Sequence, residues 1–165
     1  MIVIILTAAL IAACWKWGAW RRWREFYPTV LYVIIGNLAY DFVFSDWRLW
    51  LYNSFLGATF VGLIINFLIY PSGVMLFLAH YPERKWKQAG YIFACAVFCT
   101  LIEYVSILTG GLLYFHGWNI LSSLLLFLGM FALIRFHYKK PLFAWLVSLA
   151  CGIAVALIFS LPPLK

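Results

Sequence analysis

The feature that most constrains this chain is a series of apolar runs, separated by short segments that carry most of the charge. A helix needs about 20 apolar residues to cross the hydrocarbon core of a bilayer. Only helices and closed barrels satisfy their backbone hydrogen bonds in lipid, and continuous rather than alternating runs exclude a barrel. We therefore predict an all-α, polytopic integral membrane protein, a single bundle of six transmembrane helices. The predicted spans are 2–18, 27–44, 55–79, 90–115, 120–136 and 141–161.

Composition supports this class, because 67% of the 165 residues are hydrophobic and 10% are charged. A soluble domain of this length does not need so much apolar surface. The net charge of +7 comes from basic clusters between apolar runs. This distribution follows the positive-inside rule, so we expect membrane lipids and not nucleic acid as partners.

The segments between the runs alternate in charge. The first, third and fifth are basic, the second carries one arginine offset by Asp46, and the fourth carries no charge. Basic loops stay in the cytoplasm, so both termini are predicted to lie outside. The basic residues of the three loops are Arg21, Arg22, Arg24, Arg84, Lys85, Lys87, Arg135, Lys139 and Lys140.

The first apolar run is short for a bilayer. No basic segment precedes it, which favours a retained span over a cleaved signal peptide. Its Ala8/Ala12 and Ala9/Ala13 spacing suits close packing against a partner helix. The run is followed by tryptophans interleaved with basic residues between Trp15 and Arg24, typical of an interfacial anchor. The alternative interpretation of this cluster is a cation–π or anionic-lipid site.

Polar residues inside the spans mark a candidate site. Glu103 lies near the middle of span 90–115, where a carboxylate is costly unless it is protonated, paired or hydrated. Asn37 and Asn66 are predicted at similar depth, and Asp41 about one turn outward of Asn37. Ser106 lies outward of Glu103 on the same helix. We predict a solute or proton site made of Glu103, Asp41, Asn37, Asn66 and Ser106. The alternative is that the amides only join neighbouring helices.

The predicted outer mouth of this site lies at the ends of the same spans. Its residues are His116, Trp118, Asn119, Asp46 and Trp47. His116 follows Glu103 by thirteen residues, about 20 Å along a helix, so the two cannot share an ion unless the helix breaks, for example at Gly110-Gly111. Cys95 and Cys99 lack a third soft ligand, and neither a metal nor another cofactor is expected. Ser122 and Ser123 fit helix capping better than a nucleophilic role.

Several of these segments resemble those of small multi-span membrane proteins from spore-forming Gram-positive bacteria. The resemblance runs from about Trp23 onward. It implies a location in a bacterial plasma membrane and specifies no activity. The segments are Trp23–Pro28, the Asn37/Asp41 pair, Tyr70-Pro71, Tyr81-Pro82, Glu103, Tyr114–Asn119 and Arg135–His137.

The common motifs of hydrolases, zinc proteases and nucleotide-binding enzymes are missing from the sequence. The sequence therefore favours a non-enzymatic protein that binds or translocates a small solute or ion. Two alternatives stay open. One is a membrane-embedded enzyme acting on a lipid or isoprenoid, with His116 and an acid as its acid–base pair. The other is a scaffold or sensor subunit that docks a partner helix on the first span.

Overall fold

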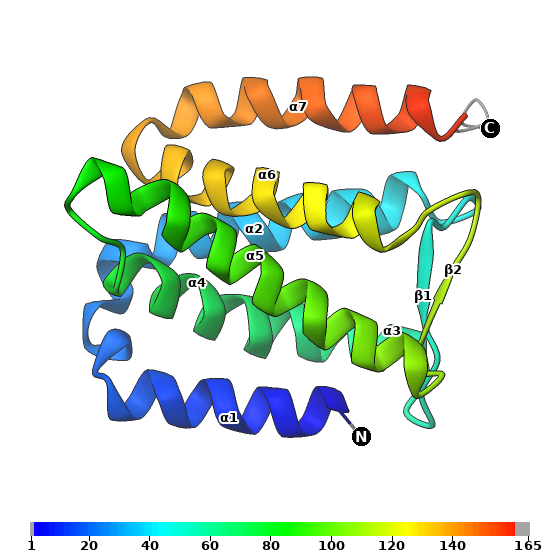
Figure 1. Ribbon diagram of the computed structural model, residues 1–165, viewed down its shortest axis with the longest axis horizontal. Coiled ribbons are helices and arrows are strands. Elements are labelled where there is room, and N and C mark those ends of the chain that lie inside the picture. Colours follow the sequence, from blue (N-terminus) through cyan, green and yellow to red (C-terminus); the bar gives the residue numbers. More distant parts are fainter. Residues whose placement is uncertain (1, 161–165) are drawn as a thin grey trace.

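The computed structural model describes residues 2–160, which form six helical rods with a two-stranded antiparallel sheet across one end (Figure 1). Five rods are long and apolar enough to cross a membrane, and α1, with 15 residues, is shorter. The predicted helical bundle is thereby confirmed. The helical elements are α1 Ile2–Lys16, η1 Ala19–Arg22, α2 Trp23–Val43, α3 Ala58–Ile64, η2 Ile65–Ile69, α4 Tyr70–Ala79, α5 Lys85–Leu108, α6 Ile120–Lys139 and α7 Pro141–Ile158; the strands are β1 Trp50–Tyr52 and β2 Leu112–Tyr114.

Two residues, one just after α5 and one just before α6, explain why the chain turns at the sheet. Gly110 has a φ of 69°, and its N–H and that of Gly111 bond back to the carbonyls of Ile107 and Ser106. This is a Schellman ending, which requires a left-handed residue that glycine adopts at little cost. Asn119 then caps α6, because its side-chain oxygen accepts the N–H groups of Leu121 and Ser122. Between these two points the chain forms β2.

The third rod combines α3, η2 and α4. Proline at position 71 has no N–H to give to the preceding turn, and the sequence predicts a kink there. The structure forms a π-helical segment, Ile65–Ile69, directly before Tyr70 and Pro71. Such π-segments are frequent at functional sites. This one carries Asn66, which is 1% exposed.

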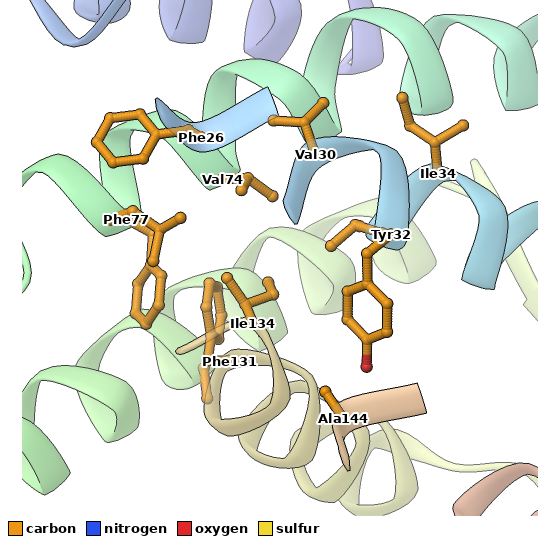
Figure 2. Close-up of a cluster of buried hydrophobic side chains, with 12 residues drawn as sticks. Phe26, Val30, Tyr32, Ile34, Val74, Phe77, Phe131, Ile134 and Ala144 are labelled. Carbon is orange, nitrogen blue, oxygen red and sulfur yellow. The ribbon is translucent and has the colours of Figure 1, made fainter. Parts of the chain in front are cut away.

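The main core lies between α2, α4, α5 and α6. Figure 2 shows Phe26, Val30 and Ile34 of α2 facing Val74 and Phe77 of α4, with Phe131 and Ile134 of α6 below them. A smaller cluster at the sheet contains Phe44, Leu49 and Trp118. Outside these clusters the helices are unusually exposed. Only 6% of the residues in the most apolar stretch of α5 are buried, and the same share in α7. Apolar surface of this extent is typical of a membrane-facing helix.

The two ends of the bundle differ in charge. We call the end with β1 and β2 the hairpin end and the opposite end the basic end. The three basic loops lie together at the basic end, while the start of α1 and the last turn of α7 point towards the hairpin end (Figure 1). This arrangement is the one that the alternating loop charges predict for an even number of crossings. Met1 and residues 161–165 lie outside the described residues.

The helix limits differ from the predicted spans at several points. Helix α5 begins at Lys85 and ends at Leu108, so the last seven residues of span 90–115 form a turn and β2 instead. Helix α2 begins at Trp23 rather than residue 27, so Pro28 is its sixth residue and lies inside the helix. The predicted end of the last span at residue 161 lies outside the described residues.

Replacement of Gly110 by alanine tests the turn between α5 and β2. A left-handed backbone costs alanine about 1–2 kcal/mol, so Gly110→Ala should lower the midpoint of thermal unfolding in detergent. The matched control is Gly129→Ala in α6, where an added Cβ meets nothing within 4 Å. The control should leave the midpoint unchanged or raise it. Equal midpoints for both variants would contradict the role given to Gly110.

Candidate functional site

The first polar cluster of the site surrounds Glu103. The Tyr114 hydroxyl donates to Glu103 Oε1 at 2.5 Å, and the Ser123 hydroxyl donates to the same oxygen at 2.7 Å. Trp118 Nε1–H donates to Ser123 Oγ at 2.8 Å. Ser123 is 1% exposed. The carboxylate therefore receives two hydrogen bonds on one oxygen, and its donors come from β2 and the first turn of α6.

The fold brings these donors to Glu103 through the turn at Gly110. After that turn β2 crosses the hairpin end and pairs with β1, with Trp50 opposite Tyr114 and Tyr52 opposite Leu112. Burial raises the pKa of the Tyr114 hydroxyl, and its hydrogen bond to Glu103 raises the pKa further. Tyr114 is therefore a neutral donor at physiological pH. The second oxygen, Oε2, has no hydrogen-bond partner among the described residues, and Glu103 is partly exposed.

The second polar cluster joins α2 to η2 and α4. Asn37 Nδ2–H lies 3.3 Å from both Asp41 Oδ2 and Asn66 Oδ1. The Tyr70 hydroxyl donates to Asn37 Oδ1 at 3.1 Å, and Asn66 donates to the Gly62 carbonyl at 3.0 Å. Asn66 is buried, whereas Asp41 is exposed. Asn37 is thus the centre of the cluster, and Asp41 is its open edge.

Tyr52 of β1 lies within electrostatic range of both clusters. Burial raises the pKa of its hydroxyl, and repulsion from Tyr70, Glu103 and Asp41 raises it further. Its ring is only partly buried. The two acids are therefore near one hydroxyl without bonding to each other. Ser106, the remaining predicted member of the site, donates to the Ile102 carbonyl of its own helix at 2.9 Å and does not bond to Glu103.

The five predicted mouth residues all lie at the hairpin end, but they do not form one contact network. His116 stacks on Trp47 with ring centroids 3.7 Å apart, and Trp47 Nε1–H donates to the Phe159 carbonyl. Trp118 is buried in the smaller core cluster and bonded to Ser123. Asn119 is the exposed N-cap of α6, and Asp46 is exposed. His116 has no polar contact with Glu103 among residues 2–160.

The sequence did not reveal three groups of this site: Tyr52, Tyr70 and Tyr114. Tyr70 directly follows the π-segment, and Tyr52 and Tyr114 lie in short strands whose sequence is as apolar as that of the helices. Ser123 was interpreted as a helix cap, but the cap is Asn119 and the Ser123 hydroxyl binds Glu103. The signal for Tyr114 was the Gly110-Gly111 pair, which ends α5 and returns the chain toward the carboxylate.

A third set of polar contacts lies toward the basic end and was not predicted. The sequence position of His137, beside Lys139 and Lys140, predicts a solvated or headgroup-facing side chain, but His137 is 4% exposed. Its Nδ1 lies 3.1 Å from Thr29 Oγ1, and its ring stacks on Tyr32. Tyr32 in turn bonds to Ser148 of α7. These contacts join α2 to both α6 and α7. Helix packing is therefore enough to explain them.

Within the described residues, no group of three or more His, Cys, Asp or Glu side chains is arranged to hold a metal ion. The four cysteines are unpaired in this part of the chain. Comparisons with protein-family models, with curated proteins and with solved structures found no match to this chain. The function must therefore be argued from the residues themselves.

Substitution of Glu103 tests whether its hydrogen bonds hold the hairpin end. Glutamine keeps an oxygen that accepts from Tyr114 and Ser123, so Glu103→Gln should change the free energy of unfolding by less than about 1 kcal/mol. Glu103→Leu leaves both hydroxyls without this acceptor and should cost about 1–3 kcal/mol. Thermal unfolding in detergent gives the comparison. Equal stability of the leucine variant would contradict the contacts assigned to Glu103.

Proposed function

We propose that the protein is a multi-pass membrane protein that binds or translocates a small solute or ion through the polar groups near the hairpin end. The proposal rests on the Glu103 carboxylate, which has one oxygen fixed by Tyr114 and Ser123 and the other without a hydrogen-bond partner in residues 2–160. A fixed carboxylate with an open oxygen suits exchange of a proton or binding of a polar or cationic group. Keeping such an acid inside apolar helices is costly, which supports a functional role.

The second cluster supports the same proposal. Asn37 donates to both Asp41 and Asn66, so the exposed acid is joined to a buried amide between α2 and η2. Asp41 is exposed and offers a second acid within range of Tyr52, which also lies near Glu103. On this proposal the two acids act as successive binding groups for the solute or ion. Among the described residues the basic side chain nearest in sequence to either acid is Arg48, which bonds to the Ser45 carbonyl.

The enzyme alternative has less support. An acid–base pair must be within hydrogen-bond reach of one substrate, and His116 is held against Trp47 rather than beside Glu103. For the scaffold alternative, the exposed Ala8, Ala9 and Ala12 of α1 offer a small-residue face. That alternative assigns no role to Glu103. We therefore retain solute or ion binding as the proposed function, in a bacterial plasma membrane as the resemblance implies.

A ligand screen tests the site directly. The purified protein is titrated with inorganic cations, small amines and small carboxylates, and binding is followed by the shift in thermal unfolding. A ligand of the wild type should bind at least tenfold more weakly to Glu103→Gln and Asp41→Asn, because each removes a charged contact worth about 1.5–3 kcal/mol. Glu25→Gln, at the basic end, is the matched control and should bind normally.

Two results would sink the proposal. The first is a ligand that binds both acid variants as tightly as the wild type. The second is chemical conversion of an added lipid that is lost in His116→Phe, which keeps the stack on Trp47, but kept in Glu103→Gln. That second result would favour the enzyme alternative.

The orientation in the membrane has its own test. In a cysteine-free background, single cysteines replacing Arg21, Arg84 and Lys139 should react with a membrane-impermeant maleimide only after permeabilisation. A cysteine replacing Ser45, at the hairpin end, should react in intact cells, as should tags at Met1 and Lys165. Labelling of the three basic-loop positions from outside would reverse the proposed topology and put the acids on the cytoplasmic side.

A further inference from the structure

A groove runs along the outside of the bundle between α2 and the third rod. It has a volume of about 340 Å³, and its lining is almost entirely apolar. The floor includes Val30 and Ile34, which belong to the core in Figure 2, and the walls are exposed aromatic and aliphatic side chains. The lining residues are Trp23, Tyr27, Val30, Leu31, Ile34, Phe67, Pro71 and Met75.

The length of the groove matches one leaflet of a bilayer. Its lining on α2 runs from Trp23 to Ile34, eleven helical steps, which is about 17 Å at the rise of an α-helix. Half of a hydrocarbon core about 30 Å thick is nearly the same length. On the side opposite α2, the groove is lined along this stretch by Pro71 and by Phe67 of the π-segment η2. The groove therefore extends from headgroup level to mid-membrane.

The end of the groove at headgroup level is aromatic and cationic. Trp23 and Tyr27 meet edge to face with centroids 5.8 Å apart, and the Arg24 guanidinium lies 5.6 Å from the centre of the Trp23 ring. Arg21 lies similarly over Trp20. A guanidinium in this position matches a phosphate, which it can bind with two parallel hydrogen bonds.

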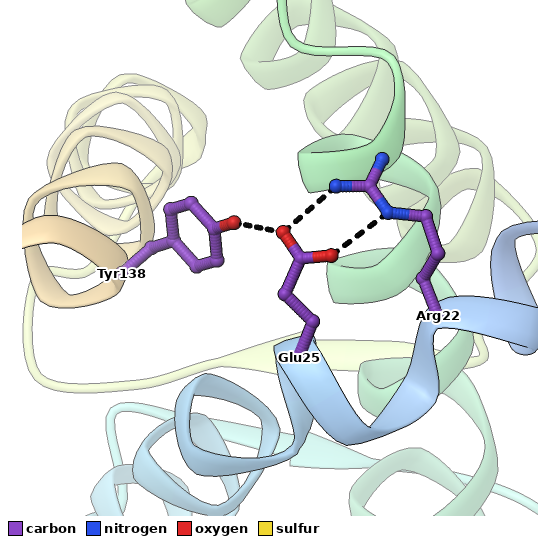
Figure 3. Close-up of polar contacts among 3 residues, drawn as sticks. All are labelled: Arg22, Glu25 and Tyr138. Atoms are coloured by element: carbon purple, nitrogen blue, oxygen red, sulfur yellow. Dashed lines mark hydrogen bonds and ion pairs between the residues drawn. The ribbon is translucent and has the colours of Figure 1, made fainter.

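The neighbouring arginine is already neutralised. Arg22 makes two hydrogen bonds to Glu25, at 2.7 and 2.8 Å, and Tyr138 bonds to the same carboxylate (Figure 3). Among the described residues this is the one ion pair, so Arg21 and Arg24 have no carboxylate partner there. The charge at the mouth of the groove is thus available to an anion from outside the protein.

We propose that this groove binds one acyl chain of an anionic phospholipid and that Arg24 binds its phosphate. The apolar floor matches an acyl chain, the length matches one leaflet, and the cationic mouth matches the phosphate. A helix from a second copy fits less well. Copies in one membrane share an orientation, so a neighbour would bring its own basic end beside Arg24. This site is separate from the acids at the hairpin end and does not rest on the proposed function.

Native mass spectrometry with defined lipids tests the proposal. The purified full chain is mixed with phosphatidylglycerol or phosphatidylcholine of the same acyl chains, and the lipid retained per chain is counted. The wild type should retain one phosphatidylglycerol in at least threefold preference to phosphatidylcholine. Arg24→Gln should lose this preference, whereas Arg84→Gln, at another basic loop, should keep it.

A second pair of variants tests the groove itself. Leu31→Trp fills the groove and should remove the retained lipid; if this variant does not fold, Leu31→Phe replaces it. Ile11→Trp is the control, because Ile11 lines a different apolar groove, between α1 and the third rod. Three results would overturn the proposal: equal retention of both lipids by the wild type, an unchanged preference in Arg24→Gln, or a dimer that Leu31→Trp dissociates in place of a lost lipid.

Discussion

The hydrogen bonds to Glu103 are the interaction on which the hairpin end depends. They join α5, β2 and the first turn of α6 at a single carboxylate oxygen. In an apolar bundle a carboxyl group without donors would be expensive, so its partners fix where β2 lies across the helices. Through Ser123 and Trp118 the same contacts reach the smaller core cluster. The hairpin end is thus a polar network inside an apolar shell.

Much of the architecture follows from the apolar runs, because a helix that crosses lipid must be long and almost uncharged. The limits of α5 were missed since Leu112–Tyr114 is as apolar as the helix before it, and only Gly110-Gly111 marks the change. Asn37 and Asn66, predicted at similar depth, are hydrogen-bonded, and Asp41 lies one turn further along α2. The donors of Glu103 could not be predicted, because Tyr114 and Ser123 reach it through a turn whose path depends on pairing with β1, sixty residues earlier.

His137 illustrates a second limit of sequence reasoning. Its neighbours Lys139 and Lys140 suggest an exposed position at the headgroups. Its burial depends on Thr29 and on stacking against Tyr32, both of α2, and these contacts exist only once α6 has packed beside α2. Periodicity along one helix does not reveal such a contact. The same is true of the groove, whose two walls come from α2 and from the third rod.

The two ends of the bundle differ in the charge of their side chains. The basic end carries Trp and Arg side chains suited to phosphate headgroups, and the hairpin end carries Asp41, Asp46 and Glu103. We propose that in a membrane the basic end binds lipid headgroups and the hairpin end meets solutes. On this account Asp41 and Glu103 are open to water from the hairpin side alone.

Chemical modification in sealed, oriented membrane vesicles tests that central claim most directly. A water-soluble, membrane-impermeant carbodiimide is added with an amine from the hairpin side, and the modified carboxyl groups are located by peptide mass spectrometry. The account predicts modification of Asp41 and Glu103 and protection of Glu25 at the basic end. Glu103 unmodified while Asp41 reacts, or Glu25 modified from the same side as both, would contradict it.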